Sequence, residues 1–591
     1  MRIRRSAFRA LLAASAYVSA CSHAPQQLDL KGFAPAGSER IRVLDIYPAV
    51  TATIVAPANI DGSKRVDLIL YALPNGNTTL QTIGRKMHEG LDWHYDIQNI
   101  GAQTRALRSR GLPQAIVVYL EADKRSWPAW RQTLGYPQAN RRIVEIVDQL
   151  RYAVGNPEHL AVTLTGHSGG GSFMFGFIDG QDSIPSWIER IAFLDANYNF
   201  AYNHGEKLVK WLRKDPRNTL VVLAYNDTNI MLDGKKVVSD SGGTWRASSR
   251  MINYLREPFE FKTDSVGDFT RYRASQIVAL LHRNPENKIL HTSMIGDMNG
   301  YMHAMLVRRP SYDRGGSVLK ASRVYEEFTA DSVVLPAATP PEIPVRATNA
   351  IEGRAFIEMV ARLSREEREE AIRRELFAGN MPSFLRDLRT VTVTGKGSDS
   401  ADHTIVYRVM PDYLSIGSDK DFVRMPMVPY TGQAFVDAFG FVLPTRKMVN
   451  DIWSAAETHL DPRPLTIERE SPFTFLQHHR IIEGQLKGVK RGTFVAGIKK
   501  DIVVTNRLLE GANRVAIYGW HYPDGKPIQP VYPGHVDWYV DYSHGVRPVE
   551  RVMTVDGKRM TFEQIMADSV LHPLLSDEGE LKVLRYARPV N

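Results

Sequence analysis

Short apolar runs alternate with amphipathic segments along the first half of the chain. The runs are rich in Val, Ile and Leu, and they cover residues 66–73, 115–120, 160–165, 191–194 and 220–225. Residues 97–109, 139–154, 205–214 and 270–283 have the apolar periodicity of helices. Buried strands that alternate with helices predict an α/β fold, in which a doubly wound, mostly parallel sheet is covered on both faces.

A second pattern begins after a proline-rich stretch. Residues 336–350 contain four prolines and are predicted to be a stiff, solvated linker. Beyond it, residues 351–385, 435–439 and 446–458 favour helices, whereas 495–505 and 514–522 favour strands. The order of these elements is irregular, so residues 351–591 are predicted to form an α+β domain. A length of 591 residues also favours two domains.

The first residues have the pattern of an export signal. Arg2, Arg4 and Arg5 precede an apolar run at 10–18 that is too short to span a membrane. Residues 18–21 resemble a bacterial lipobox, with Val in place of the usual Leu. We therefore expect residues 1–21 to be a signal peptide, Cys21 to be lipidated and 22–40 to be a tether. A plain cleaved signal peptide is the alternative.

Export changes the charge only modestly. The formal net charge is +9, and loss of the four arginines before Cys21 lowers it to +5. Hydrophobic residues at 43% and charged residues at 24% are ordinary for a globular protein. We see no run of Lys and Arg that indicates nucleic acid as a partner. By analogy with lipoproteins, Ser22 after the cysteine favours the outer membrane of the cell envelope.

One glycine-rich segment follows a predicted strand directly. The run at 160–165 continues into Gly166-His167-Ser168-Gly169-Gly170, and a helix is predicted after it. This is a G-x-S-x-G pattern between a strand and a helix. A serine on such a strained turn is lifted above the sheet, and a side chain at either flanking glycine would clash. Ser168 is therefore the candidate nucleophile, although a turn that only packs helix on sheet is the alternative.

Residues 41–335 resemble the α/β-hydrolase superfamily on the strength of this motif and the alternating elements. The resemblance implies acyl transfer to water through an acyl-enzyme, with no cofactor. It also implies a catalytic acid and then a histidine, in that order, after the serine. His303 follows a strand predicted near 288–295 and is the candidate base, with His291 as its competitor. Asp227 is the favoured acid, and Asp195 is the alternative acid.

The resemblance further implies an oxyanion hole, which stabilises the negative charge of the tetrahedral intermediate. The backbone N–H of Gly169, next to the nucleophile, is the first expected donor. The loop at 74–77 is expected to supply the second, with Gly76 allowing close approach of the backbone. This loop lacks the glycine run of many lipases, so the resemblance leaves the identity of the second donor open.

The second half has a dense aromatic segment. Residues 518–544 interleave tyrosines and tryptophans with histidines. Aromatic faces with polar partners suit sugar rings, which favours a cell-envelope glycan as a ligand. His535, Asp541 and His544 could instead supply three metal ligands, and a mainly structural domain is also open.

Taken together, the sequence predicts an exported serine hydrolase that cleaves an ester or amide, anchored by lipid in the cell envelope. The expected substrate is a small or glycan-linked ester or amide, and the C-terminal domain is expected to bind substrate or glycan. Two alternatives stay open. One is an envelope-binding lipoprotein with an inactive hydrolase domain, and the other is a metallohydrolase centred on 535–544.

Overall fold

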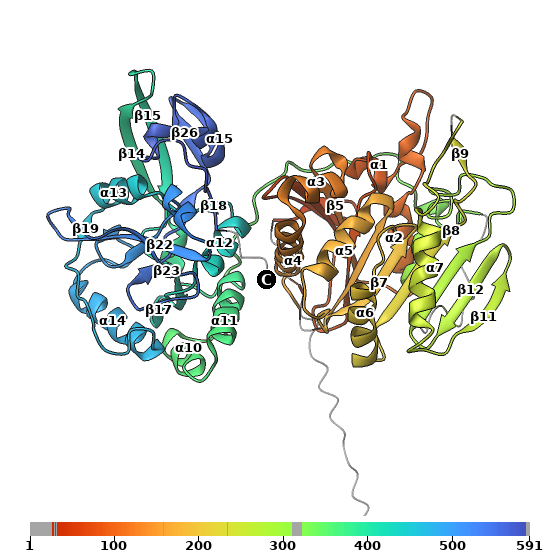
Figure 1. The fold of residues 1–591 in the computed structure, drawn as a ribbon, viewed down its shortest axis with the longest axis horizontal. Helices are drawn as coiled ribbons and strands as arrows, with labels where there is room; N and C mark the ends of the chain where they lie inside the picture. Colours follow the sequence, from red (N-terminus) through yellow and green to blue (C-terminus); the bar gives the residue numbers. More distant parts are fainter. Residues whose placement is uncertain are drawn as a thin grey trace, which may run out of the picture.

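The computed structural model describes residues 27–586, except 29, 31, 158, 233, 310, 311, 313–318, 320 and 321. Its two halves form two bodies joined by one connecting segment (Figure 1). Cys21 and the predicted signal peptide lie outside the described residues. In the part of the chain that the structure covers, no helix combines the length and the apolar character needed to cross a bilayer.

An 11-stranded sheet organises the first half, with the order β1-β2-β3-β5-β4-β6-β7-β8-β13-β12-β11. The strands are β1 (Ala34–Ala36), β2 (Glu39–Ile46), β3 (Val50–Pro57), β4 (Val66–Ala72), β5 (Ala115–Ala122), β6 (Leu160–His167), β7 (Ile188–Leu194), β8 (Thr219–Tyr225), β11 (Lys262–Val266), β12 (Phe269–Ala274) and β13 (Ile277–His282). The six central strands, from β5 to β13, are parallel. Antiparallel strands flank them on both sides.

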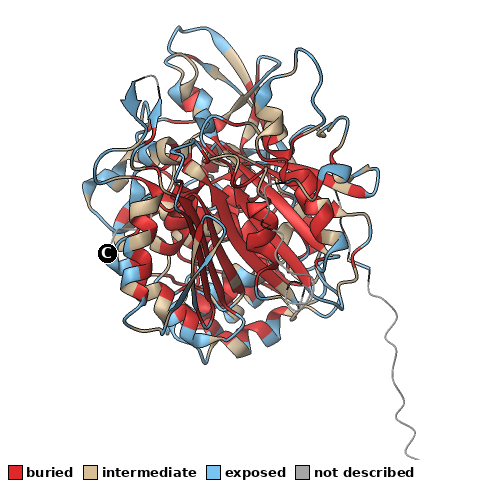
Figure 2. Ribbon diagram, turned by 90° about the vertical axis from the view of Figure 1, so that its right-hand side faces the viewer, coloured by how far each residue is buried: buried red, intermediate tan, exposed pale blue. Residues whose placement is uncertain are grey.

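Helices cover both faces of this sheet (Figure 1). They are α1 (Thr79–Ile83), α2 (Ile100–Ser109), α3 (Trp127–Leu134), α4 (Tyr136–Ala153), α5 (Gly171–Asp179), α6 (Tyr202–Lys214), α7 (Thr244–Leu255) and α8 (Gly300–Leu306). Successive side chains of a strand point to opposite faces. Accordingly, Leu68 and Leu70 of β4 join one core with α3–α7, whereas Ile69 and Tyr71 join another with α2 and α8. The central strands are buried along their length (Figure 2).

The predicted layered α/β fold of the first half is thus confirmed, but two elements were predicted wrongly. Residues 270–283 contain β12 and β13 and not a helix, and residues 288–295 contain no strand, since turns begin at 291. Ile277–His282 is a continuous apolar run on a fully buried strand, and periodicity alone cannot distinguish such a run from a helix. The sheet also begins at Ala34, within the segment 22–40 that was predicted to be a tether.

The second half has its own sheets and its own hydrophobic core. One sheet has the order β18-β25-β15-β26-β27 with β14 beside β15, and a four-stranded sheet has the order β23-β22-β21-β24. The first contains β14 (Arg389–Lys396), β15 (Asp402–Val409), β18 (Phe441–Val442), β25 (Val549–Glu550), β26 (Val552–Val555) and β27 (Lys558–Thr561). The second contains β21 (Lys500–Ile502), β22 (Arg514–His521), β23 (Pro527–Val536) and β24 (His544–Gly545).

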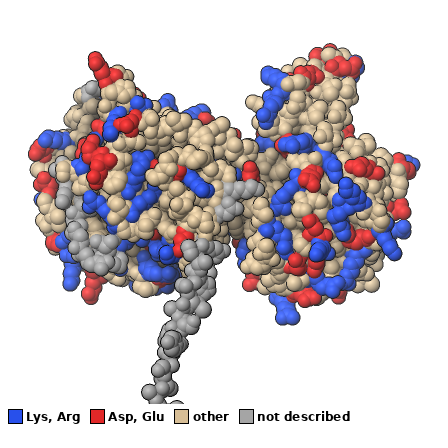
Figure 3. Space-filling model, turned by 180° about the vertical axis from the view of Figure 1, so that it is seen from behind, with Lys and Arg blue, Asp and Glu red and all other residues tan. Residues whose placement is uncertain are grey.

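Helices surround these sheets and complete an α+β arrangement. They are α10 (Gly353–Val360), α11 (Arg365–Phe377), α12 (Pro429–Ala438), α13 (Arg446–Ala455), α14 (Pro472–Gln485) and α15 (Phe562–Ala567). The helical segment predicted at 351–385 is therefore two helices. The strand predicted at 514–522 matches β22, whereas that at 495–505 contains only short strands. On the face drawn in Figure 3, basic and acidic side chains are interspersed over both halves.

Candidate active site

The candidate nucleophile lies where the order of the large sheet reverses. From β4 the chain continues to β5 on one side, and β6 then pairs with β4 on the other side. In open parallel sheets, ligands bind at such a point, in the crevice outside the carboxyl ends of the strands. Ser168 follows the carboxyl end of β6 directly, so it occupies this position.

The turn that carries Ser168 is strained, as the sequence predicted. Strand β6 leads into a 3₁₀ turn at Ser168–Gly170 and then into α5. Ser168 has a φ of 53°, a left-handed conformation that non-glycine residues rarely adopt. A Cβ atom on Gly170 would lie 2.2 Å from the backbone oxygen of Ala72 in β4. The turn can therefore approach β4 only because glycine stands there, and Ser168 is left partly exposed at the edge.

An acid and a histidine are paired beside this turn. Asp195 follows β7 and is 1% exposed, and its Oδ2 lies 2.5 Å from His291 Nδ1. The hydroxyl of Thr244 donates to the other carboxylate oxygen, Oδ1. These contacts hold the carboxylate in one orientation against the imidazole. Because Nδ1 faces the carboxylate, Nε2 is the ring nitrogen that can exchange a proton elsewhere.

The imidazole of His291 lies against the residue that precedes the nucleophile. The rings of His167 and His291 have centroids 4.5 Å apart, and His167 Nε2 lies 3.0 Å from the backbone oxygen of His291. The phenol of Tyr198 lies near Ser168, and burial raises the pKa of this phenol. Tyr198 was not recognised in the sequence, although its place three residues after Asp195, in the same loop, is a signal that could have pointed to it.

The structure places His303, the base favoured from the sequence, away from this group. His303 lies in α8, and its Nδ1 is 2.9 Å from the hydroxyl of Tyr312. Burial, helped by Arg190 and Arg271, lowers the pKa of His303 to about 3. Arg190 is near the start of β7, so His303 lies toward the amino edge of the sheet, opposite Ser168. The geometry therefore favours the competitor, His291.

Asp227, the acid favoured from the sequence, is close to the pair but makes no contact with His291. Its Oδ2 accepts a hydrogen bond from the backbone N–H of Thr244 at 3.1 Å, and its Oδ1 is buried without a hydrogen-bond partner. Burial and the nearby Asp195 raise the pKa of Asp227 to about 6. The alternative acid, Asp195, is thus the one that the structure brings to a histidine.

The raised pKa of Asp227 predicts a stability effect that depends on pH. A carboxyl whose folded-state pKa lies above its ordinary value destabilises the fold when it ionises, and this loss develops between about pH 4 and pH 6. The change Asp227→Asn removes the ionisation, so it should raise the free energy of unfolding by about 1–2 kcal/mol at about pH 8. Urea unfolding at about pH 4 should show no gain. An equal gain at both pH values would contradict this origin.

The two oxyanion donors expected from the sequence, the N–H groups of Gly169 and Gly76, have different surroundings. Gly169 follows Ser168 at the start of the turn, where its N–H can face a substrate oxygen. The N–H of Gly76 instead donates to the backbone oxygen of Arg125 at 2.9 Å, so this donor is already engaged. The neighbouring Asn75 is exposed and packs on Gly169, where a Cβ atom would lie 2.1 Å from its Oδ1. Asn75 is therefore the residue of this loop whose side chain lies against Gly169.

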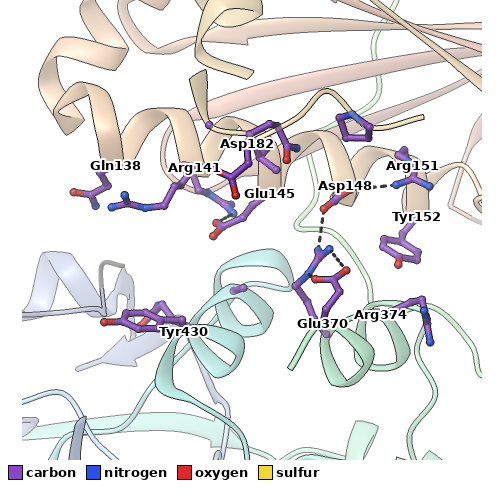
Figure 4. Close-up of a pocket in the computed structure, with 18 of the residues that line it drawn as sticks. Gln138, Arg141, Glu145, Asp148, Arg151, Tyr152, Asp182, Glu370, Arg374 and Tyr430 are labelled. Atoms are coloured by element: carbon purple, nitrogen blue, oxygen red, sulfur yellow. Dashed lines mark hydrogen bonds and ion pairs between the residues drawn. The ribbon is translucent and has the colours of Figure 1, made fainter. Parts of the chain in front are cut away.

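A cavity of about 560 Å³ lies elsewhere, between α4 and the helices α11 and α12 of the second half (Figure 4). Its charged side chains are largely paired with one another. Arg373 of α11 lies 2.9 Å from Asp148 of α4, and Arg151 also contacts Asp148, at 3.3 Å. None of the residues that line it belongs to the group around Ser168. We therefore treat it as part of the contact between the two halves.

The metal alternative at 535–544 finds no support in the described residues. Among them, no group of three or more His, Cys, Asp or Glu side chains is arranged to hold a metal ion. The carboxylate of Asp541 is taken by Arg469 at 2.5 Å and by the hydroxyls of Tyr539 and Ser543. His544 Nε2 is 3.9 Å from this carboxylate and makes no hydrogen bond to any described residue.

Comparisons with known proteins give structural similarity only. No protein-family model matches the chain, and no curated protein matches it. A thermostable esterase is similar over 44% of this chain and 59% of its own length, with 11% identity and a TM-score of 0.27. A feruloyl esterase module from Clostridium thermocellum (11% identity, 42% of this chain, 83% of the module, TM-score 0.25) is also similar. So is a siderophore hydrolase from Aspergillus nidulans (13% identity, 46% of this chain, 94% of the hydrolase, TM-score 0.25).

These similar structures are esterases and hydrolases, and each corresponds to less than half of this chain. This chain spans 59% of the first of them. Similarity at this level assigns no activity by itself.

Proposed function

We propose that this protein is a serine hydrolase that cleaves an ester or amide, with Ser168 as nucleophile, His291 as base and Asp195 as the acid that orients the base. The observation that carries the proposal is the contact of 2.5 Å between Asp195 and His291, next to the strained turn of Ser168. A serine hydroxyl becomes a good nucleophile only when an oriented base removes its proton.

The reaction then follows from the arrangement. Ser168 Oγ attacks the carbonyl carbon of the substrate while His291 Nε2 accepts the hydroxyl proton. The carbonyl oxygen becomes an oxyanion, for which the N–H groups of Gly169 and Asn75 are the proposed donors. His291 returns the proton to the leaving alcohol or amine as its bond to carbon breaks. Water then attacks the acyl-enzyme, gives a proton to His291, and releases the acid as Ser168 is reprotonated.

The burial of Asp195 fits this role. Asp195 is almost completely buried, and its negative charge stabilises the imidazolium that forms when His291 takes the proton. The phenol of Tyr198 lies beside the proposed nucleophile.

Covalent labelling tests the proposal directly. A fluorescent fluorophosphonate reacts with activated serines, so the purified wild-type protein should be labelled and Ser168→Ala should not. Ser172→Ala is the matched control, because Ser172 lies four residues along on α5 and contacts Arg131; it should label like wild type. A wild-type protein that melts cooperatively yet stays unlabelled would argue against an activated Ser168.

A further inference from the structure

A second group of reactive side chains lies in the second half, where the backbone of β22 is irregular. Trp520 has a φ of 56°, which is a genuine outlier for a bulky residue. The pairing of β22 with β23 also shifts register twice, between Val515 and Ile517 and between Ile517 and Gly519. Strained residues and β-bulges concentrate at functional sites. Neither feature takes part in the hydrolase site of the first half.

Two basic side chains beside this irregular strand are incompletely paired among the described residues. His544 is 1% exposed, and both of its ring nitrogens are buried without a hydrogen bond. Lys500 in β21 is 8% exposed, and within the described part of the chain its ammonium group makes no ion pair. It lies 5.8 Å from the ring of Trp520. Buried polar groups are almost always satisfied, so the two unsatisfied ring nitrogens of His544 indicate a missing ligand, water or ion.

The charge around these groups is unbalanced toward the positive. Asp541 is the carboxylate that faces Lys500 and both imidazoles, and it is fully buried. Arg469 already binds it at 2.5 Å, and Lys499 and Lys500 lie close by. Lys499 also faces Asp412, and burial lowers its pKa to about 7. Asp541 therefore faces two full cations, Arg469 and Lys500, and an anion would offset the excess.

Aromatic rings border the same group on its exposed side. His535 stacks on Tyr539 with ring centroids 4.4 Å apart, and Tyr532 meets His535 edge to face at 5.1 Å. His535 and His544 are 6.0 Å apart, so the rings lead from the surface to the buried imidazole. Tyr532 is 43% exposed. Exposed aromatic faces with polar neighbours bind sugar rings well.

We infer that Lys500, Arg469, His535 and His544, with the rings of Tyr532 and Tyr539, form a site for a sugar that carries an anionic group, a carboxylate or a phosphate. The rings contact the sugar, and the basic side chains hold the anion. This inference deepens the glycan-binding role expected for the second half. It does not depend on whether Ser168 is active.

Binding measurements on the purified protein test this site. Calorimetry with trigalacturonate, glucose 6-phosphate and neutral maltotriose should show at least one acidic sugar binding about 10-fold or more tightly than maltotriose. Trigalacturonate alone would identify a carboxylate, and glucose 6-phosphate alone a phosphate. Lys500→Gln should weaken the acidic sugar about 10-fold or more. Lys526→Gln, an exposed lysine at the β22–β23 turn, is the matched control and should change affinity less than 2-fold.

Two further measurements distinguish a loss of binding from failure of the hydrolase proposal and from unfolding. Ser168→Ala should bind the acidic sugar like wild type, so failure of the hydrolase proposal and failure of this one can be told apart. If Lys500→Gln no longer melts cooperatively, His535→Gln at its part-exposed position replaces it and should also weaken binding. Equal affinity for acidic and neutral sugars, no binding of any of the three, or unchanged binding by the folded Lys500→Gln would overturn the inference.

Discussion

Replacement of His291 by alanine should lower kcat/KM for an activated ester by about 10⁴-fold or more. His291 is the histidine that lies 2.5 Å from Asp195, and it packs on His167 next to the nucleophile. Without it, no base removes the proton of Ser168 and none protonates the leaving group. Steady-state kinetics with a p-nitrophenyl ester measure this loss, and the melting temperature shows that the fold is intact.

Two companion variants make the result specific. Asp195→Asn should also lose about 10³–10⁴-fold, because an amide neither orients the imidazole in the same way nor stabilises its cation. His303→Ala is the matched control: a buried histidine is removed from α8, so stability should fall, but kcat/KM of the folded enzyme should stay within about 3-fold. If His303→Ala lost activity and His291→Ala kept it, the choice made from the sequence would be restored.

The sequence predicted Ser168 as the candidate nucleophile because the signal for it is local. A glycine-flanked serine between a strand and a helix occupies consecutive residues, and the strain at Ser168 follows from that connection. The acid and the base are different, since residues 195, 227, 291 and 303 are brought together or kept apart only by tertiary packing. The error at 270–283 had a direct consequence, because a helix there moved the last predicted strand to 288–295 and so favoured His303 over His291.

The second half was less predictable for a related reason. Its aromatic segment was recognised in the sequence, but the members of the site come from separate elements. Lys500 comes from β21, Arg469 from the segment before α14, and His535 from β23. No spacing along the chain links 469, 500 and 535. Likewise, the ring nitrogens of His544 lack hydrogen-bond partners in the described part of the chain because of how the fold packs. The residue pattern does not predict this.

Substitution of Gly170 by alanine should lower the free energy of unfolding by about 3–5 kcal/mol and abolish most of the activity. The new Cβ atom would lie 2.2 Å from the backbone oxygen of Ala72 and 2.9 Å from its carbonyl carbon. Both atoms belong to β4, a central strand that cannot move without disturbing its pairs with β5 and β6. The strain has to be relieved by shifting the start of α5, and this shift would displace Ser168. Urea unfolding and the same ester assay measure the two effects.

Gly484→Ala is the matched control for this change. Gly484 lies in α14, is exposed, and has open space around its Cα, so alanine there should stabilise the protein by about 0.5–1 kcal/mol through helix propensity. If the free energy of unfolding falls for Gly170→Ala and rises for Gly484→Ala, the loss at Gly170 comes from its contact with β4. If Gly170→Ala were as stable and as active as wild type, the turn would not need the close approach to β4, and the geometric argument for Ser168 as a strained nucleophile would lose its basis.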